Sequence, residues 1–280
     1  MNAPHFILTR FNLLYPGAAL DTAWHEERHM LFEQFCLPSV KAQTAHSFHW
    51  LVFADSRTPD PFRARLAAYQ ESYANLTVCF ILGPDPVAMV AAVRQRLPAG
   101  ASHLITTTLD NDDAFGREFV ARVQGQFREQ DFELVNFLHG LRYNVKTRKL
   151  YALALETNPF ISLIERIGPQ RQFRSIVGCL PHSSIKGRFT QIKNIESPPL
   201  WLQVLHGRNA APTATWGRKR APLRQLPDLF GLDEKALPPV AEHETLFALQ
   251  HARAAVERRL IDTLNDEQQR RLRAWLAGRR

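Results

Sequence analysis

Short apolar runs alternate with longer segments of mixed polarity along the first half of the chain. The apolar runs are rich in β-branched and aromatic residues and predict buried strands, at 6–9, 48–54, 76–82 and 103–109. The segments that follow them predict helices, at 24–35, from 60, from 86 up to Pro98, and at 114–127. Because strands that alternate with helices are joined by right-handed crossovers, this half predicts a mostly parallel sheet covered on both faces.

Three prolines mark expected helix boundaries. Asp60–Pro61 and Asp85–Pro86 each place a capping carboxylate before a proline, which suits the first turn of a helix. Pro38 is expected to end the helix at 24–35, since proline in a helix interior removes a backbone donor.

The pattern changes after residue 130. Shorter apolar stretches separated by turns predict strands arranged as hairpins, at 132–137, 141–145 and 150–156. Two further strands are expected at 173–179 and 200–205, and a short helix is expected after Asn158–Pro159.

These elements divide the chain into three expected parts. An α/β domain covers 1–207, with a mostly parallel first half at 1–128 and a mainly antiparallel second half at 129–207. Residues 208–242 are rich in Pro and Arg and predict a connection, and 243–280 predict a basic C-terminal helical extension.

The composition of the 280 residues restricts the class of protein. Hydrophobic residues make up 45% and charged residues 22%, values typical of a chain that buries a core. The chain has no run of about 18 apolar residues, which a helix that spans a bilayer would need. Arg10 interrupts the apolar stretch near the N-terminus, and the three cysteines lack a paired spacing. Neither a signal peptide nor a disulfide framework is indicated, so a cytoplasmic location is expected.

Basic side chains outnumber acidic ones by 35 to 27, which gives a formal net charge of +8. This charge favours anionic partners: nucleic acid, acidic lipid or phosphorylated small molecules. Residues 251–280 contain eight arginines and four acids. They have three readings: a solvated helical hairpin packed on the domain, a nucleic-acid surface, or a helix on the inner face of the membrane. The hairpin is favoured, because Trp275 alone offers a large ring for base stacking.

The most conspicuous polar cluster directly follows the strand at 103–109. Asp110, Asp112 and Asp113 place three carboxylates within four residues, at a strand end where parallel sheets bind ligands. Grouped carboxylates repel one another, and a divalent cation removes that repulsion. Magnesium and manganese suit oxygen-rich sites completed by substrate phosphates, so the cluster indicates a metal–diphosphate site.

Two other structures would also place aspartates here. A calcium-binding loop that starts at Asp110 would need glycine at its sixth position, where the chain has Phe115. Alternatively, Asp112 or Asp113 could cap a helix that begins at Ala114. The apolar strand before the cluster favours the metal site over the helix cap.

The segment His25–His29 is a literal H-E-x-x-H sequence, which on a helix presents both histidines to a zinc ion. Zinc also needs a third protein ligand, and Phe35 stands where the extended motif has a histidine. The segment is therefore expected to form a charged face of the first helix, not a zinc peptidase site.

The aspartate cluster also carries a family resemblance. Leu109–Ala114 (LDNDDA) resembles the aspartate motif of nucleotide-sugar glycosyltransferases of the GT-A fold. Similarity to the first half of the large inverting family of that fold extends upstream, through 31–40, Gln43, 48–55 and Thr58. Similarity to its rhamnosyltransferase family lies in His5–Phe6, Arg10–Asn12 and Asn158–Phe160. The resemblance implies a GT-A-like (Rossmann-like) fold over 1–207, with 1–128 as the nucleotide-binding half and 129–207 as the acceptor half. It also implies a nucleoside-diphosphate sugar as donor and Mn²⁺ or Mg²⁺ as cofactor.

The resemblance also assigns roles to individual residues. Contacts with the nucleotide and its sugar fall on Thr9, Arg10, Asn12, Asp55, Arg94 and Asp110. Among these, Asp55 would accept a hydrogen bond from a pyrimidine, and Arg94 would approach the diphosphate. Asp112 and Asp113 would hold the metal, and His206, in the segment 201–207, would bind metal or pyrophosphate.

A carboxylate should deprotonate the acceptor hydroxyl if the anomeric centre is inverted. Glu165, in the segment 158–165, and Glu156, at a strand end, are the candidates. The usual acid pair of the inverting family is not visible beyond the metal motif, so inversion and retention both stay open.

The sequence thus predicts a metal-dependent glycosyltransferase that acts on a glycan, a lipid-linked acceptor or a small molecule, with rhamnose as the implied sugar. The alternative is a basic nucleic-acid-binding α/β protein without catalysis.

Overall fold

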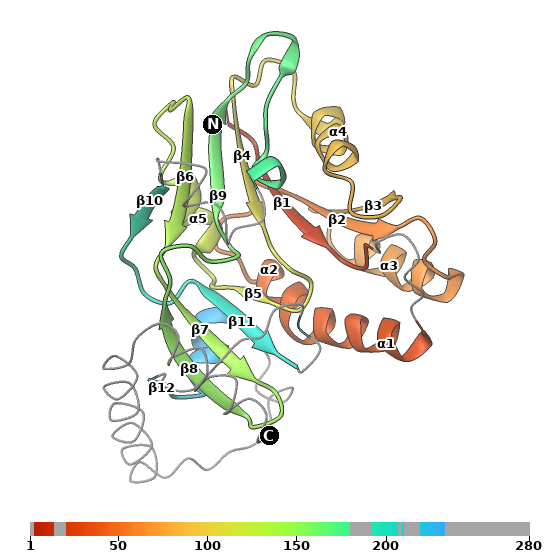
Figure 1. Ribbon diagram of the computed structural model, residues 1–280, viewed down its shortest axis with the longest axis vertical. Helices are drawn as coiled ribbons and strands as arrows, with labels where there is room; N and C mark the ends of the chain where they lie inside the picture. Colours follow the sequence, from red (N-terminus) through yellow and green to blue (C-terminus); the bar gives the residue numbers. More distant parts are fainter. Residues whose placement is uncertain (1–2, 14–20, 180–191, 207–208, 210–218, 233–280) are drawn as a thin grey trace, which may run out of the picture.

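The computed structural model describes residues 3–13, 21–179, 192–206, 209 and 219–232. Their strands form two sheets (Figure 1). The first has seven strands in the order β10-β6-β9-β4-β1-β2-β3, and the second has five in the order β12-β8-β7-β11-β5. The second sheet lies beyond the carboxyl ends of the strands of the first.

The first sheet is mostly parallel. Its strands are β1 (His5–Arg10), β2 (His49–Asp55), β3 (Leu76–Ile81), β4 (His103–Thr108), β6 (Phe132–Phe137), β9 (Ser162–Arg166) and β10 (Ile192–Ile195). Only β9 runs against its neighbours, β4 and β6. The α/β class and the GT-A-like, mostly parallel sheet are confirmed, as are the four strands predicted in the first half. The sheet also takes strands from both expected halves of the domain.

Strand order indicates the ligand-binding edge of this sheet. The chain builds outward from β1 to β3 and then returns to β4, on the other side of β1. In such sheets the crevice at the carboxyl ends of the strands flanking this reversal is the usual ligand site. Here that crevice lies between β1 and β4.

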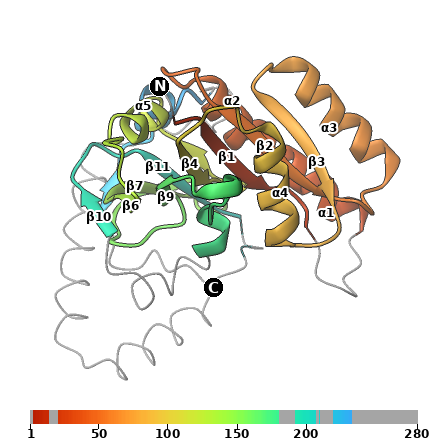
Figure 2. The same ribbon diagram turned by 90° about the horizontal axis from the view of Figure 1, so that it is seen from above.

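Helices cover both faces of this sheet. They are α1 (Thr22–Leu31), a π-helical turn (Phe32–Cys36), α2 (Leu37–Lys41), α3 (Asp60–Ser72), α4 (Pro86–Arg96) and α5 (Phe119–Gln124). Ile7 of β1 packs with the core of the π turn, α3 and α5, whereas Phe6 and Leu8 pack with the core of α4. Figure 2 shows α3 and α4 on opposite sides of β3. Burial on both faces explains the continuous apolar runs of these strands.

The helix boundaries follow the prediction in part. The Asp85 carboxylate caps α4 by accepting from the Val87 N–H, as predicted. The predicted cap at Asp60 is wrong, because Pro59 occupies the cap position and Asp60 is already helical. Pro38 does not end the first helix either. The helix widens into the π turn after α1, and Pro38 then lies in the first turn of α2. A proline is tolerated there because no backbone donor is needed at that position.

Three further predictions are corrected, two of them by long-range pairing. Residues 114–115 form β5 (Ala114–Phe115), which pairs with β11, so the helix predicted at 114–127 is only α5, from Phe119, and is not capped by Asp112 or Asp113. The helix expected after Pro159 is instead strand β9, held between β4 and β6. The strand expected at 173–179 is a 3₁₀ helix at Ile176–Cys179.

The second sheet contains the predicted antiparallel hairpin. Its remaining strands are β7 (His139–Asn144), β8 (Lys149–Ala154), β11 (Trp201–Leu205) and β12 (Arg220–Ala221). Antiparallel β7 and β8 form the hairpin, but β6 joins the other sheet. Within the expected connection, 219–232 add β12 and α7 (Gln225–Phe230), whose Leu226 and Phe230 enter the core of this sheet. The basic helices expected at 243–280 lie outside the described residues.

Within the described parts of the chain, no helix is both long and apolar enough to cross a bilayer.

Candidate active site

The aspartate cluster lies in the crevice between β1 and β4. The Leu109 N–H donates to Leu8 of β1 at 3.1 Å, and the Asp113 N–H donates to the Asp110 carbonyl at 3.2 Å. These bonds fold 109–113 into a tight turn beside the end of β1. The turn then leads into β5 and the second sheet.

Asp112 is the centre of a buried charged cluster. Its Oδ2 accepts from Arg28 Nη1 at 3.0 Å and lies 2.8 Å from His206 Nε2. Arg28 comes from α1 and His206 directly follows β11, so three separate elements meet here. Burial opposes ionisation of Asp112, but the His206 hydrogen bond and the Arg28 charge together hold its pKa below the usual value. The structure therefore keeps Asp112 as a carboxylate.

Asp113 has a different environment. Its side chain is buried, and Oδ1 accepts from the Val204 N–H at 2.8 Å. Burial, reinforced by the negative charges of Asp112 and Asp110, raises its pKa well above the usual value. Asp113 thus ties the turn to β11, and the two neighbouring carboxyl groups are driven to opposite protonation behaviour.

Helix α1 contributes two residues that the sequence did not single out as site residues. Besides Arg28, Glu27 approaches the cluster, with Oε1 3.7 Å from His206 Nδ1. Both belong to the H-E-x-x-H segment, whose histidines have other contacts. His29 Nδ1 lies 2.8 Å from Tyr69 Oη, and the rings of His25 and His29 stack on Phe62. The charged face of this helix, and not its histidines, is what the site uses.

Two buried donors beside Asp112 in the chain or bonded to it have no acceptor within the described residues. They are Arg28 Nε and Asn111 Nδ2. A buried donor left without a partner costs about 1–3 kcal/mol, and native structures rarely tolerate several in one place. A ligand that offers several acceptor oxygens, such as a diphosphate, would satisfy them.

Arg10 and Asp110 lie at the more exposed rim of the same crevice. Arg10 Nη2 donates to Asp110 Oδ1 at 3.0 Å, and both side chains are more than a third exposed. The structure therefore brings together Arg10, Asp110, Asp112, Asp113 and His206 from the predicted set.

Thr9 and Asn12 are buried and bonded within the protein. Thr9 Oγ1 accepts from the Trp50 indole at 2.9 Å. Asn12 accepts from the Asp55 N–H at 2.9 Å and donates to Thr58 Oγ1 at 2.9 Å. These contacts fasten the end of β1 to the turn after β2, so both side chains are already hydrogen-bonded within the protein.

Asp55 ends β2 with a fully buried carboxylate. Oδ1 accepts from the backbone N–H of Arg57 and from its Nε, whereas Oδ2 accepts from Arg57 Nη2 at 2.9 Å and from the Gly83 N–H at 3.2 Å. A pyrimidine could bind Asp55 only by replacing one of these donors.

Arg94 and Glu165 lie at the opposite edge of the sheet. Arg94 is in the last turn of α4, which runs back to the amino end of β4, and its guanidinium stacks on Phe173. Glu165 pairs in register with Leu104, near the amino end of β4, and accepts from the backbone N–H groups of residues 174 and 175. These positions do not favour the diphosphate role predicted for Arg94 or the base role predicted for Glu165.

Glu156 remains on the expected side of the molecule. It is exposed, in the segment between β8 and β9. The carbonyl of Pro159 in that segment accepts from Thr108 Oγ1 at 2.8 Å, at the end of β4. The segment therefore borders the crevice.

The donor set of the cluster suits a cation that is only partly held by protein. Within the described residues, no three His, Cys, Asp or Glu side chains form a metal-binding group. Asp112 and His206 do bring an oxygen and a nitrogen to 2.8 Å, as two ligands of one ion would be. Mg²⁺ and Mn²⁺ accept such a small protein set when phosphate oxygens complete it. Asp113 is less suited, because its buried oxygen is bonded to β11.

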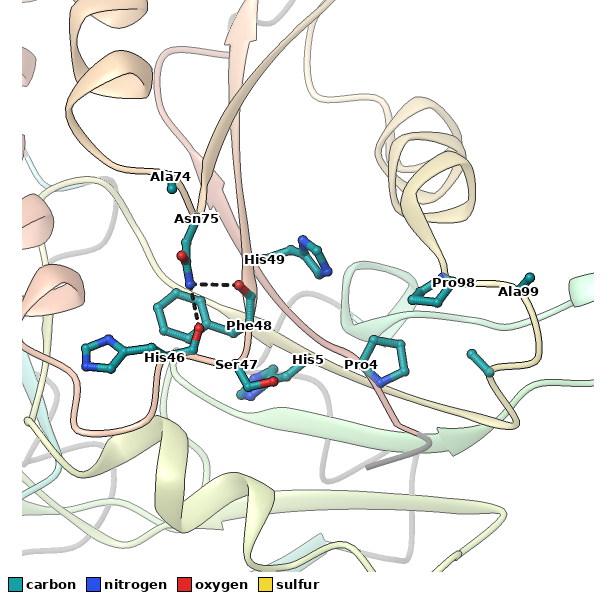
Figure 3. Close-up of a pocket in the computed structure, with 11 residues that line it drawn as sticks. Pro4, His5, His46, Ser47, Phe48, His49, Ala74, Asn75, Pro98 and Ala99 are labelled. Carbon is teal, nitrogen blue, oxygen red and sulfur yellow. Dashed lines mark hydrogen bonds between the residues drawn. The ribbon is translucent and has the colours of Figure 1, made fainter.

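A pocket of about 430 Å³ opens at the amino edge of the sheet (Figure 3). Its lining comes from the segments that precede β1, β2, β3 and β4 and includes His46, His49 and Pro98. Asn75 donates there to the carbonyls of His46 and Phe48. No carboxylate lines this pocket, and the aspartate cluster lies at the other edge.

Comparisons with known proteins agree with the type of site. Residues 7–218 match the model of a family described as "Putative rhamnosyl transferase". No curated protein matches the chain.

Similar solved structures are distant in sequence. S. aureus TarS 1–349 in complex with UDP-GlcNAc is 12% identical with a TM-score of 0.46, over 75% of this chain and 62% of that chain. S. aureus TarS is 13% identical with a TM-score of 0.43, over 72% of this chain and 37% of that chain. A structure described as a putative nucleotide-diphospho-sugar transferase, from Desulfovibrio desulfuricans G20, is 10% identical with a TM-score of 0.34, over 71% and 82%. The match thus spans less than two thirds of the TarS chains.

Proposed function

The chain belongs to the family of putative rhamnosyl transferases, and from this premise we propose that it moves rhamnose from a nucleoside diphosphate to a hydroxyl acceptor, with Mn²⁺ or Mg²⁺ as cofactor. The acceptor is a glycan, a lipid-linked glycan or a small molecule that carries a free hydroxyl. The reaction takes place in the crevice between β1 and β4.

One observation carries the proposal: a buried, ionised Asp112 between Arg28 and His206, with unused donors around it. An ionised carboxylate and an imidazole can hold a divalent cation. The unused donors can bind the oxygens of a diphosphate. Metal and diphosphate are the two parts of a nucleotide-sugar donor that such a site must recognise.

Each residue of the site has a proposed role that follows from its position. Asp112 and His206 would hold the cation, which neutralises charge on the leaving nucleoside diphosphate when bound. Asp113 keeps the turn against β11, and Arg10 with Asp110 lines the rim. Glu156, in the segment between β8 and β9, is the carboxylate proposed to take the proton of the acceptor hydroxyl as a general base.

The first experiment is a thermal-shift panel of nucleoside diphosphates and nucleotide sugars, each with Mn²⁺, Mg²⁺ or chelator. UDP and UDP-GlcNAc, which the TarS structures contain, belong in the panel beside thymidine and guanosine nucleotides and their rhamnose conjugates. Binding to the folded state raises stability by RT ln(1 + [L]/Kd), about 2.7 kcal/mol at a hundredfold excess over Kd. A shift with one nucleotide that chelator removes is expected, and the rhamnose conjugate should be the sugar donor that is turned over.

Two variants show whether the shift comes from the crevice. Asp112→Asn should abolish the metal-dependent shift, whereas Asp131→Asn, a change at an exposed acid paired with Arg166, should leave it intact. An unchanged shift in Asp112→Asn contradicts the site. Binding of polyanions that weakens with salt and ignores Mn²⁺, without any nucleotide shift, would favour the nucleic-acid-binding alternative.

A further inference from the structure

Arg28 is an unusual residue to find buried on a helix. It is 8% exposed, and its guanidinium lies 5.2 Å from the centre of the Trp24 ring, one turn earlier on α1. Nη1 donates to Asp112, but Nε is also buried and has no acceptor within the described residues. A buried arginine is normally saturated with acceptors, because desolvation of its charge must be offset. Arg28 is saturated only in part.

Within the described residues, Arg28 has one acceptor, and this acceptor is shared. Oδ2 of Asp112 also lies 2.8 Å from His206 Nε2, so one carboxylate oxygen meets two groups. A divalent cation at this oxygen would compete with the guanidinium for the same lone pairs, and the two positive charges would repel at such short range. If the cation binds, Arg28 needs another anionic partner.

A diphosphate is the partner whose shape fits this need. A guanidinium offers paired N–H groups that match phosphate oxygens, with greater strength than a neutral hydrogen bond. From this geometry we propose that Arg28 binds the diphosphate of the donor. It pairs with Asp112 while no donor is present and moves to the phosphate oxygens when metal and nucleotide enter. This assignment rests on the proposed function, since it names the ligand of one residue in that site.

The exchange predicts opposite effects of one substitution on two ligands. In Arg28→Gln the competitor for Asp112 is gone, so Mn²⁺ alone should bind more tightly than to the wild type. The nucleoside diphosphate with Mn²⁺ should bind roughly ten- to hundredfold more weakly, the loss expected for a charge-assisted hydrogen bond. The nucleoside without phosphates should bind equally well. A purely structural role for Arg28 would weaken all three ligands together.

The experiment is calorimetric titration of the full chain with Mn²⁺, with the nucleoside diphosphate in Mn²⁺, and with the nucleoside. Arg28→Gln and Arg28→Lys are compared with the wild type, and Arg122→Gln serves as control because its exposed pair with Glu118 lies on α5. The lysine variant should lose part of the diphosphate affinity, since a point charge replaces a bidentate group. If the glutamine variant does not fold, the lysine variant still tests the assignment through its selective loss of diphosphate affinity.

The outcomes separate this assignment from the proposed function. Diphosphate affinity within twofold of the wild type, or a parallel loss for Mn²⁺ and nucleoside, overturns the role of Arg28 alone. A wild type that binds no nucleoside diphosphate overturns the proposed function, and the role of Arg28 with it.

Discussion

At the carboxyl edge of the seven-stranded sheet, Asp112 stays ionised between Arg28 and His206. At the amino edge of the same sheet, His5 is buried. Burial lowers the pKa of His5 to about 3, and its neutral ring bonds to Thr107. The pocket of about 430 Å³ lies at the amino edge, whereas the charged cluster around Asp112 lies at the carboxyl edge. We therefore place the proposed reaction by the arrangement of charge, and not by the size of a cavity.

The largest contrast between the edges should come from two carboxyl-to-amide changes. Asp112→Asn removes the ionised ligand and is expected to weaken metal-dependent nucleotide binding more than a hundredfold, roughly 2.7 kcal/mol or more. Glu165→Gln, at the amino edge, should leave that binding unchanged and lower the free energy of unfolding by about 1–3 kcal/mol, because one buried backbone N–H loses its acceptor. Nucleotide titration and urea unfolding of both variants measure the two effects. A nucleotide-binding defect in Glu165→Gln would remove the distinction.

A smaller effect is expected one contact away from the cluster. Glu27 lies beside His206 Nδ1, the ring nitrogen that faces away from Asp112. A carboxylate at this position fixes the orientation of a metal-binding histidine, and its loss typically costs ten- to a hundredfold in metal affinity. We expect about a tenfold weaker Mn²⁺ affinity for Glu27→Gln, measured by calorimetry, and partial recovery in Glu27→Asp. An equal loss in Glu26→Gln, whose parent residue pairs with Arg65, would contradict a specific role.

Low pH is expected to lower the free energy of unfolding through His5, at the amino edge. Because the pKa of His5 falls from 6.5 to about 3 on folding, the unfolded chain binds this proton more readily at intermediate pH. The free energy of unfolding should therefore fall as pH drops from 6.5 towards 3, by up to about 1.4 kcal/mol per pH unit. His5→Gln should flatten that dependence without changing nucleotide binding at neutral pH. Unfolding measured at pH 7, 6, 5 and 4 tests this, and an unchanged slope would show that other groups dominate.

The smallest effect is expected for Arg94. Its exposed guanidinium stacks on Phe173, an interaction worth about 0.5–1 kcal/mol at an exposed site. Arg94→Gln should change stability by no more than this and leave diphosphate affinity within twofold, which titration of the variant determines. A tenfold loss would return Arg94 to the site, as the family resemblance implies.

Local patterns were sufficient for the first sheet and for the aspartate turn. Strands buried on both faces give continuous apolar runs, and the acids that follow β4 stand at a strand end by chain order alone. Arg94 lies away from the aspartates, where the resemblance had placed it, and the strand order explains why. A helix that leaves the carboxyl end of β3 must return to the amino edge before β4 begins, so its last turn lies far from the aspartates.

Other features depend on partners far away in the chain. Ala114 and Phe115 are a strand because β11 pairs with them, and Ser162–Arg166 is a strand because it fits between β4 and β6. The π turn that admits Pro38 also depends on packing. From the sequence, Arg28 could be predicted only as a charged residue on a helix. Its meeting with Asp112 across 84 positions is a tertiary contact that no local pattern indicates.

Hydrogen exchange with and without nucleoside diphosphate and Mn²⁺ tests the central claim most directly, because it compares both edges of the sheet in one sample. The account predicts protection of the turn at 109–113, of α1 around Arg28, and of 204–206. It predicts no change at 46–49 and 98–101, beside the amino-edge pocket. Protection confined to those amino-edge segments would contradict the assignment of the active site.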